Sequence, residues 1–311
     1  MSLATSSVLD VAPPLRRRPA LSYELFPARS DAHFVALQET ITHLEATQPD
    51  YVSVTSRIGQ QNLNRVLELT DHVLSCTRLR PLVHLTGLGS TREELAHVVS
   101  ALLDRGVRGV LALRGDAPPD YQPDEEEFPF GRYVVELIRE IEASRSALLA
   151  AGRVAIGVAA YPHRHPESPS RQHDIEVLVS KERSGADFAI TQVFFDPAVY
   201  TDLVRRARRA GLRMPIIPGV IPAVDPHRLR RLAELSGVEA PRDLLHALDS
   251  AESEAERRRI GVRFTVDLVR AVLDEGAPGL HLFTFNRHAE ALDVLDSLDL
   301  DRWSSSLEGA A

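Results

Sequence analysis

The sequence predicts an α/β protein, a single-domain (β/α)8 (TIM) barrel with extra helices before its last strand. Three observations favour this fold. Eight short runs of apolar and β-branched residues recur along the chain, and most of them are separated by a stretch with helical periodicity. The eight units occupy about 280 residues, which is a usual size for such a barrel. With 311 residues, of which 44% are apolar, the chain can bury a sizeable core.

The predicted elements alternate along the chain. The strands are expected at 21–26, 51–55, 82–86, 107–113, 154–160, 188–194, 215–220 and 280–285. Between the third and fourth strands, TREELAHVVSALLDRG opens with a capping pattern at Thr91 and Glu94 and closes on Gly106, which indicates a helix. The long interval before the last strand predicts helices at 226–237, 241–250 and 252–275. Residues 1–19 are expected to be a disordered lead-in, 20–300 the barrel domain and 301–311 a tail.

An open, doubly wound sheet is the alternative fold. Such sheets usually carry a glycine-rich dinucleotide fingerprint after one strand. The nearest candidate here, Gly87-Leu88-Gly89, does not complete that pattern. The barrel is therefore favoured, and any nucleotide would have to be held in another way.

Composition excludes several classes of function. The net charge of −8 argues against a general affinity for nucleic acid or anionic membranes. No apolar run reaches transmembrane length, and the lead-in lacks the apolar core of a signal peptide. Cys76 is the only cysteine, which excludes a disulfide within the chain, and its helical context predicts a buried thiol. We expect a cytoplasmic protein that acts on small molecules, with a homo-oligomer left open.

Polar residues lie at or just after the C-terminal ends of the predicted strands, where a barrel holds its catalytic groups. In order they are Glu24, Thr55, His84, Arg114 with Asp116, Tyr161 with His165, Gln192, and Asn286 with Arg287. Each has a structural explanation when taken singly, such as a capped strand end or a local Arg114–Asp116 ion pair. Their coincidence at seven strand ends predicts a shared polar pocket.

Glu24 lies in the apolar run LSYELFP at the first of these ends. An ionised carboxylate in such a strand would cost several kcal/mol unless it were paired or protonated. In a half-buried pocket, the pKa of Glu24 should rise above its ordinary value of about 4.3. A protonated Glu24 could then act as a general acid near neutral pH.

Other chemistries lack their residues. The pair His163 and His165 has no carboxylate or cysteine at metal-ligand spacing, so no metal is expected. The chain has no Gly-x-Ser-x-Gly elbow, no phosphate-binding loop and no paired-histidine zinc helix. Lys181 is the single lysine among 36 basic residues, which leaves open either a site-specific role or a bias toward arginine.

Several segments resemble the methylenetetrahydrofolate reductase family in order and spacing. They are LSYELFPAR, DYVSVTS, LVHLTG, VLALRGDAPPD, VAAYPHRHPES, AITQVFFD, IIPGVIP and LFTFNR, and the resemblance covers about residues 20–298. The chain resembles the compact bacterial form. The resemblance implies a barrel that reduces 5,10-methylenetetrahydrofolate to 5-methyltetrahydrofolate with NAD(P)H, normally with FAD as the intermediate carrier.

The resemblance also implies roles for individual residues. Glu24 matches the acid that assists opening of the folate's five-membered ring, while Asp116 and Gln192 match residues that hold the pterin. Arg287 matches a substrate-binding arginine, and Arg228 stands where the family has a substrate-side Gln. The family's flavin contacts map onto Thr55, His84, Arg114, Gly115, Asp116, Tyr161, His165, Asp174 and Lys181.

Departures from the family pattern concentrate in the flavin cradle. Ser56-Arg57-Ile58 replaces a glycine-containing turn, Val177 replaces Asn, and Ser180 replaces a basic residue. Nearer the substrate, Leu232 replaces Phe and Phe283 replaces Tyr. We therefore expect NADH, or NADPH, to reduce the folate directly, with FAD doubtful. The alternatives are the FAD-mediated form of the reaction, a deazaflavin reductant, a pterin-binding methyltransferase barrel and a catalytically silent folate-binding paralogue.

Overall fold

The computed structural model describes residues 18–55, 60–115, 130–145 and 152–307, and its strands form one parallel sheet. The strands are β1 Ala20–Leu25, β2 Tyr51–Val54, β3 Pro81–Thr86, β4 Gly109–Leu113, β5 Ala155–Ala160, β6 Phe188–Thr191, β7 Ile216–Ile217, β8 Gly219–Val220 and β9 Gly279–Phe283. Their order in the sheet is β7-β6-β5-β4-β3-β2-β1-β9-β8.

The seventh predicted strand closes the barrel, although it is divided into β7 and β8 by Pro218. β7 pairs with β6, and β8 pairs with β9. Proline has no N–H to donate, but its carbonyl accepts a hydrogen bond from the His281 N–H at 3.0 Å. The prediction of an eight-stranded (β/α)8 barrel is therefore confirmed, with one strand interrupted by a proline.

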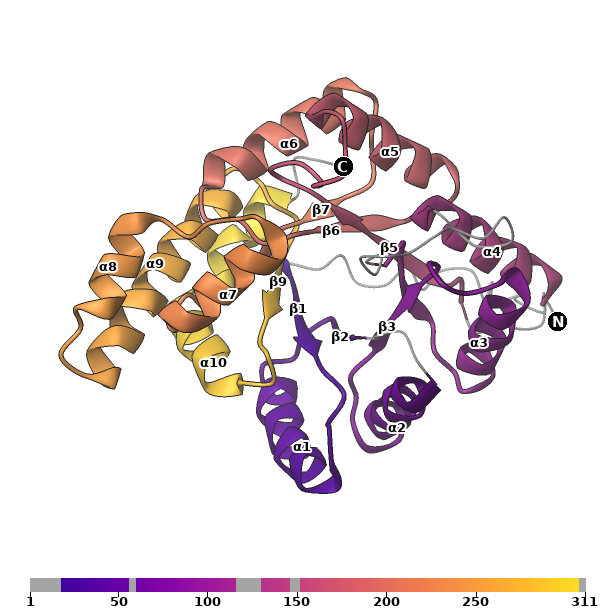
Figure 1. Ribbon diagram of the computed structural model, residues 1–311, viewed down its shortest axis with the longest axis horizontal. Coiled ribbons are helices and arrows are strands. Elements are labelled where there is room, and N and C mark those ends of the chain that lie inside the picture. The colour runs from indigo at the N-terminus through magenta and orange to yellow at the C-terminus, as the bar shows by residue number, and fades with distance from the viewer. Residues whose placement is uncertain (1–17, 56–59, 116–129, 146–151, 308–311) are drawn as a thin grey trace, which may run out of the picture.

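Helices surround the strands (Figure 1). They are α1 Asp31–Ala46, α2 Gln60–Cys76, α3 Arg92–Asp104, α4 Gly131–Ser144, α5 Arg171–Arg183, α6 Pro197–Arg209, α7 Pro226–Ser236, α8 Arg242–Asp249, α9 Glu254–Asp274, α10 His288–Asp296 and the 3-10 helix η2 Leu300–Leu307. The three helices expected before the last strand are present. The capping box of α3 is also present, with Glu94 N–H donating to the Thr91 hydroxyl and Thr91 N–H to the Glu94 carboxylate.

Alternation along β1 divides the core into an outer and an inner part. Leu21, Tyr23 and Leu25 are almost fully buried and belong to the large apolar core that includes residues of the surrounding helices. Ser22 and Glu24, which alternate with them, face the barrel interior. The first strand therefore presents polar groups to the inside of the barrel.

Aromatic and aliphatic side chains fill another part of the barrel interior. Leu82, Leu111 and Ile190 form a small buried cluster with Phe188 and Tyr51 packed against it. Gly157 makes room for this cluster, because a Cβ there would lie 2.8 Å from the Phe188 ring and 2.9 Å from Leu111.

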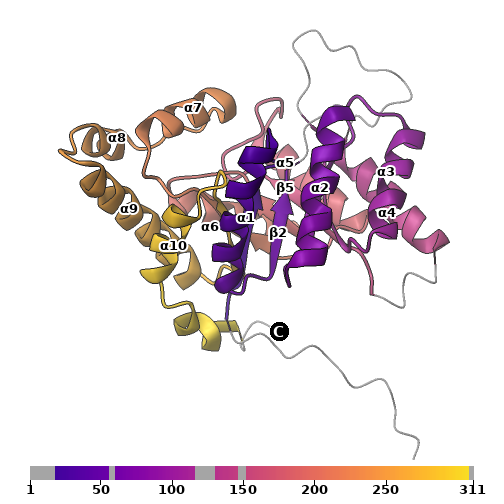
Figure 2. The ribbon, with the colours of Figure 1, turned by 90° about the horizontal axis from the view of Figure 1, so that it is seen from below.

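A second apolar cluster joins the barrel to α7 and α8. Its buried members include Phe195, Ile221 and Leu229, and Phe283 and Phe285 pack against it from β9 and the loop that follows. In Figure 2 the arrow of β2 points toward the end of the molecule where α7 and α8 lie. These helices therefore cover one side of the end at which the strands finish.

Three findings bear on the compositional expectations. Cys76 is exposed at the end of α2, so the prediction of a buried thiol was wrong: the last turn of that helix turns this side chain toward solvent. Trp303 of η2 is buried and donates to Asp274 at 2.8 Å, so part of the predicted tail packs on the barrel domain. Within the described ranges, no helix is both long enough and apolar enough to cross a membrane.

Candidate active site at the barrel mouth

Glu24 lies near the end of β1 with only 8% of its surface exposed. Burial raises the pKa of this carboxyl from 4.5 to about 7, because the charged form loses hydration; an interaction with the Thr55 hydroxyl partly opposes the rise. The expected upward shift is confirmed. The raised pKa keeps protonated Glu24 available at neutral pH, and the protonated carboxyl is the form that a general acid requires.

Two neutral imidazoles lie in the same barrel interior. The Ser22 hydroxyl, two residues before Glu24, lies 2.9 Å from Nδ1 of His281. Burial lowers the pKa of His281 to about 3 and that of His84 to about 4, and the proximity of His84 adds to the effect on His281. Both rings are therefore uncharged at neutral pH, and they add no positive charge that would lower the pKa of the Glu24 carboxyl.

Two buried polar atoms of β2 and β3, Oγ of Ser53 and Nε2 of His84, have no hydrogen-bond partner among the described residues. Ser53 is the register partner of Glu24, and Thr55 follows β2 on the same face. Because buried polar groups are normally paired, these atoms are positions that water or a bound ligand can satisfy.

The segment after β9 meets the end of β1 through side chains. The Thr284 hydroxyl donates to the main-chain carbonyl of Glu24 at 2.7 Å. The Asn286 amide bonds to both the N–H and the carbonyl of Phe26, at 2.8 Å each. The rings of Phe26 and Phe285 stack with their centroids 5.7 Å apart.

Arg228 and Arg287 are brought together by a carboxylate that they share. Glu290 of α10 accepts from Arg228 at 3.0 Å and from Arg287 at 3.1 Å. The Arg228 side chain is 15% exposed and has Asp225 3.7 Å away, whereas the Arg287 side chain is 57% exposed. Arg287 is therefore the more accessible of the two for a substrate carboxylate.

Four of the residues assigned to the flavin by resemblance form a separate group, whereas Thr55 and His84 lie near Glu24 and His281. Arg114 pairs with Glu167 at 2.5 Å, and the Glu167 N–H donates to Nδ1 of His165 at 3.1 Å. Asp174 accepts from the His165 N–H at 3.2 Å, and the Tyr161 ring meets the His165 ring edge-on. The structure thus gathers Arg114, Tyr161, His165 and Asp174 on one side of the mouth.

Lys181 belongs to the same side but points into the fold. Its ammonium donates to the Ala159 carbonyl of β5 at 3.0 Å, and burial lowers its pKa to about 8. The exposed Val177, one turn earlier on α5, offers no polar contact at its tip. Of the two cations expected to hold the flavin, Lys181 is bound to a main-chain carbonyl and is not free to meet a dinucleotide pyrophosphate, whereas Arg114 pairs with Glu167 through one nitrogen and keeps its buried Nε without a partner among the described residues.

The remaining predicted residues are placed only in part. Gln192 follows β6, where its side-chain oxygen accepts from the Val193 N–H and its own N–H donates to Ala160. Gly115 follows β4 with a φ of +94°, a conformation that suits glycine. Asp116, Ser56 and Ile58 lie outside the described residues.

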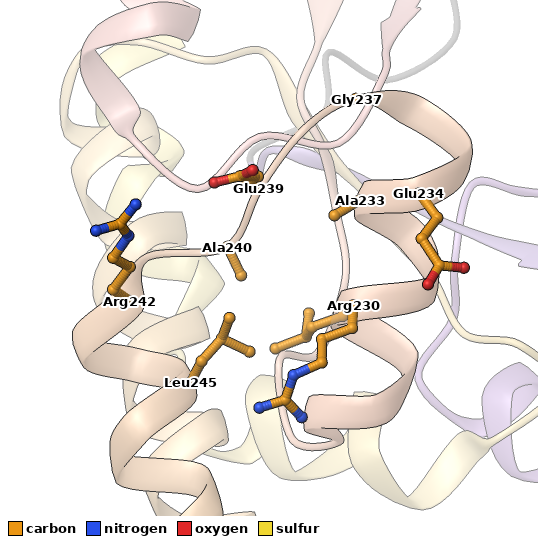
Figure 3. Close-up of a pocket in the computed structure, with 9 residues that line it drawn as sticks. Arg230, Ala233, Glu234, Gly237, Glu239, Ala240, Arg242 and Leu245 are labelled. Carbon is orange, nitrogen blue, oxygen red and sulfur yellow. The ribbon is translucent and has the colours of Figure 1, made fainter.

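A hollow of about 500 Å³ lies away from these groups, between α7 and α8 (Figure 3). Its lining includes Leu229, Ala240 and Leu245 together with charged residues such as Arg230, which pairs with Asp249. It contains none of the predicted site residues. Among the described residues there is also no group of three or more His, Cys, Asp or Glu that could hold a metal. The barrel mouth remains the candidate site.

Sequence reasoning missed four contributors to the mouth. Glu167 and Glu290 each bind a predicted site arginine, Thr284 holds the main chain at Glu24, and His281 lies beneath it. Glu290 carried a weak signal, because it follows Arg287 by three positions at the start of a helix. The others depend on contacts between segments far apart in the chain.

Comparison with known proteins identifies the family of the chain. A family model described as methylenetetrahydrofolate reductase matches residues 12–299. The 5,10-methylenetetrahydrofolate reductase of Escherichia coli K12 is 31% identical over 86% of this chain and 86% of its own length. An Arabidopsis thaliana protein named methylenetetrahydrofolate reductase (NADH) 1 is 27% identical over 90% of this chain and 48% of its own length. A Caenorhabditis elegans protein named probable methylenetetrahydrofolate reductase (NADPH) is 29% identical over 90% and 42%.

A solved structure shares the fold. It is an uncharacterized Clostridium thermocellum protein described as binding two copies of 5-methyl-5,6,7,8-tetrahydrofolic acid, with a TM-score of 0.61. The alignment covers 94% of this chain and 96% of the other, at 12% identity. At that identity the likeness concerns the fold alone.

Proposed function

The chain belongs to the methylenetetrahydrofolate reductase family, and from this premise we propose that it reduces 5,10-methylenetetrahydrofolate to 5-methyltetrahydrofolate with a hydride taken directly from NADH or NADPH. The observation that carries the proposal is the buried Glu24 at the barrel mouth, with its pKa raised to about 7. The names of relatives that carry NADH and NADPH support a nicotinamide reductant.

Glu24 supplies the proton that the reaction consumes. It protonates the anilino nitrogen of the folate's five-membered ring, and the bond from that nitrogen to the one-carbon unit breaks. The electron pair of the neighbouring nitrogen then forms a 5-iminium cation, and the hydride of the nicotinamide adds to its carbon. The overall balance is one methylenetetrahydrofolate, one NAD(P)H and one proton giving one methyltetrahydrofolate and one NAD(P)⁺.

The other residues of the mouth bind and orient the folate. Gln192 can present its amide to the donor–acceptor edge of the pterin, and Asp116 is proposed to share that role. The exposed Arg287 can hold a carboxylate of the substrate's glutamate. Phe283 and Leu232, which pack on the apolar cluster beside the mouth, can form a wall for the flat rings.

The contacts made by the residues assigned to the flavin favour direct hydride transfer over hydride transfer through FAD. Arg114 is paired with Glu167, Lys181 is bonded to a main-chain carbonyl, and Val177 presents an apolar surface on α5. A dinucleotide pyrophosphate needs cations and N–H donors that are free to meet it. The proposed step therefore uses no flavin.

Two measurements on the purified protein test the proposal. Its absorbance spectrum should lack a stoichiometric flavin band, and NADH oxidation under anaerobic conditions should require methylenetetrahydrofolate. Addition of FAD should leave the rate unchanged. A bound flavin, or a rate that rises with FAD, would overturn direct transfer, whereas the absence of folate-dependent oxidation of both NADH and NADPH would overturn the reductase assignment itself.

A further inference from the structure

We propose that Thr284 and Asn286 are positioning residues, which hold the Glu24 carboxyl at the barrel mouth by fixing the main chain of Glu24 and Phe26 through their side chains. The inference rests on the proposed function, because it concerns the acid of that reaction. It gives the segment after β9 the role of positioning the acid, a role that is separate from binding of substrate or cofactor.

We call the Thr284 and Asn286 side chains the clamp. They bind the chain just beyond the point where main-chain pairing of β1 with β9 ends. The register of β1 with β9 runs from Ala20 opposite Gly279 to Glu24 opposite Phe283, and β9 ends at that residue. Beyond it, the Glu24 carbonyl meets the hydroxyl of Thr284 at 2.7 Å. Thr284 is 1% exposed, so this bond is shielded from water.

Asn286 continues the pairing by one further step. Its side-chain oxygen accepts from the Phe26 N–H and its side-chain nitrogen donates to the Phe26 carbonyl, both at 2.8 Å. A single amide thus satisfies both main-chain groups of Phe26, as a neighbouring strand would. The main chain is therefore fixed at the carbonyl of Glu24 and, two residues later, at the N–H and the carbonyl of Phe26.

The backbone of this segment adopts a conformation that costs free energy, and this cost points to a functional role. Phe285 and Asn286 have φ values of +51° and +59°, in the left-handed region that residues with a side chain seldom adopt. Two consecutive residues in this region form a strained turn, and such strain persists only where surrounding contacts enforce it. The turn directs the Asn286 amide at Phe26 and places the Phe285 ring on the Phe26 ring.

Position and acidity of Glu24 are linked by burial. The raised pKa of this carboxyl has loss of hydration as its main cause. A looser end of β1 would let the carboxyl reach more water, and its pKa would then fall toward 4.5. Thr284 and Asn286 accordingly act on the reaction through Glu24, by bonds to the main chain of Glu24 and Phe26.

Two pairs of variants test the clamp. Thr284→Val removes the hydroxyl while it keeps the shape, and Thr284→Ser keeps the hydroxyl. Asn286→Gly removes the amide while glycine retains the left-handed backbone. Its control is Gln48→Gly, because Gln48 is an exposed residue with a φ of +52° whose side chain lies outside the mouth.

The readouts are kcat against pH, the KM for the folate, and amide hydrogen exchange of the peptide 20–28. For Thr284→Val and Asn286→Gly we expect kcat to fall about tenfold with a smaller change in KM, since displaced catalytic groups lose rate steeply. The pH at which kcat is half lost should move down by about half a unit or more, and exchange of the peptide should accelerate. Thr284→Ser and Gln48→Gly should resemble the wild type.

The proposal is overturned if Thr284→Val and Asn286→Gly keep the wild-type pH profile and kcat, even where their stability falls. It is equally overturned if exchange of peptide 20–28 does not change. Failure of the proposed function is separate: it would appear as full activity in Glu24→Gln or as no folate-dependent oxidation in the wild type. In that event, hydrogen exchange alone decides whether the clamp holds the end of β1.

Discussion

The guanidinium of Arg228 and the carboxylate of Glu290 lie 3.0 Å apart, and the second oxygen of that carboxylate is taken by Arg287 at 3.1 Å. Arg228 also covers the face of the Phe285 ring, 5.1 Å from its centre. Glu290 thus joins α10 to α7 and orients two cations at the edge of the mouth. Because Arg228 is enclosed by Glu290, Asp225 and Phe285, only Arg287 keeps an open side for a ligand.

Replacement of Arg287 by Ala should weaken folate binding and spare the chemical step. We expect the KM for methylenetetrahydrofolate to rise about two- to fivefold, the upper part of the range for loss of one exposed charge pair, with kcat changed less than about twofold. Steady-state kinetics at low salt provide the measurement. Arg263→Ala, an exposed arginine of α9, is the matched control and should change neither constant. An unchanged KM in Arg287→Ala would refute the substrate contact.

Replacement of Glu24 by Gln should nearly abolish turnover. Loss of a general acid lowers rates by about 10²- to 10⁴-fold, while a neutral amide of the same shape should leave the folate Kd within about threefold of wild type. Single-turnover reduction and fluorescence binding separate the two quantities. Equal loss of binding and rate would instead indicate a folding defect.

The pH dependence of the wild type should follow the protonation of Glu24. A raised carboxyl pKa of about 7 means that the acid is present below that pH and is lost above it. Activity should therefore decline as pH rises through about 7, by about tenfold for each unit once the carboxyl is mostly ionised. A rate that stays level from pH 6 to 9 would contradict this role, provided that hydride transfer is shown to limit turnover by a deuterium isotope effect.

Acid should destabilise the fold through His84 and His281. Their folded pKa values, about 4 and about 3, lie below the ordinary 6.5, so the unfolded chain binds more protons as pH falls below 6.5. Each imidazole should remove about 2 kcal/mol of unfolding free energy between pH 7 and pH 5. The raised pKa of Glu24 acts in the opposite direction over part of this range, so the test is a comparison of variants.

His84→Gln should lose about 2 kcal/mol less than the wild type between those two pH values. Urea unfolding at pH 7 and pH 5 gives both free energies. If the wild type and His84→Gln show the same pH dependence, the neutral buried state of this ring is incorrect.

Gly157→Ala should strain the barrel interior. The new Cβ would lie 2.8 Å from the Phe188 ring and 2.9 Å from Leu111, which is closer than packed atoms allow. Overpacking of this kind costs about 1–3 kcal/mol of unfolding free energy. Gly131→Ala is the control, because its Cβ would meet no atom closer than 3.4 Å and the position is helical. Thermal or urea unfolding should therefore show a clear loss only for Gly157→Ala.

Much of the fold could be predicted because its signals are local. The alternation of short β-branched runs with amphipathic stretches indicated the strands, and the Thr91–Glu94 capping box indicated where α3 begins. Glu24 could be predicted as a perturbed acid for the same reason, since a carboxylate in an apolar strand has few environments that tolerate it. Cys76 shows the limit, because a helical pattern does not specify which way the last turn faces.

The candidate site was predictable as a set of residues, and its internal pairings were not. Strand ends in a parallel barrel meet at one rim, so the order of residues along the chain is enough to bring Glu24, Thr55 and Gln192 to the same end. By contrast, the pairing of Arg114 with Glu167 and the hydrogen bond from Lys181 to Ala159 decide whether a cation is free to bind a cofactor.

The sequence by itself determined the barrel, the family and the acid at the end of the first strand, because periodicity and short motifs are properties of neighbouring residues. Only the tertiary structure decided that Thr284 and Asn286 hold that acid in place, that Glu290 joins two arginines, and that Pro218 divides the closing strand. Contacts across about 260 residues depend on how strands and loops pack in space, and no local pattern records them.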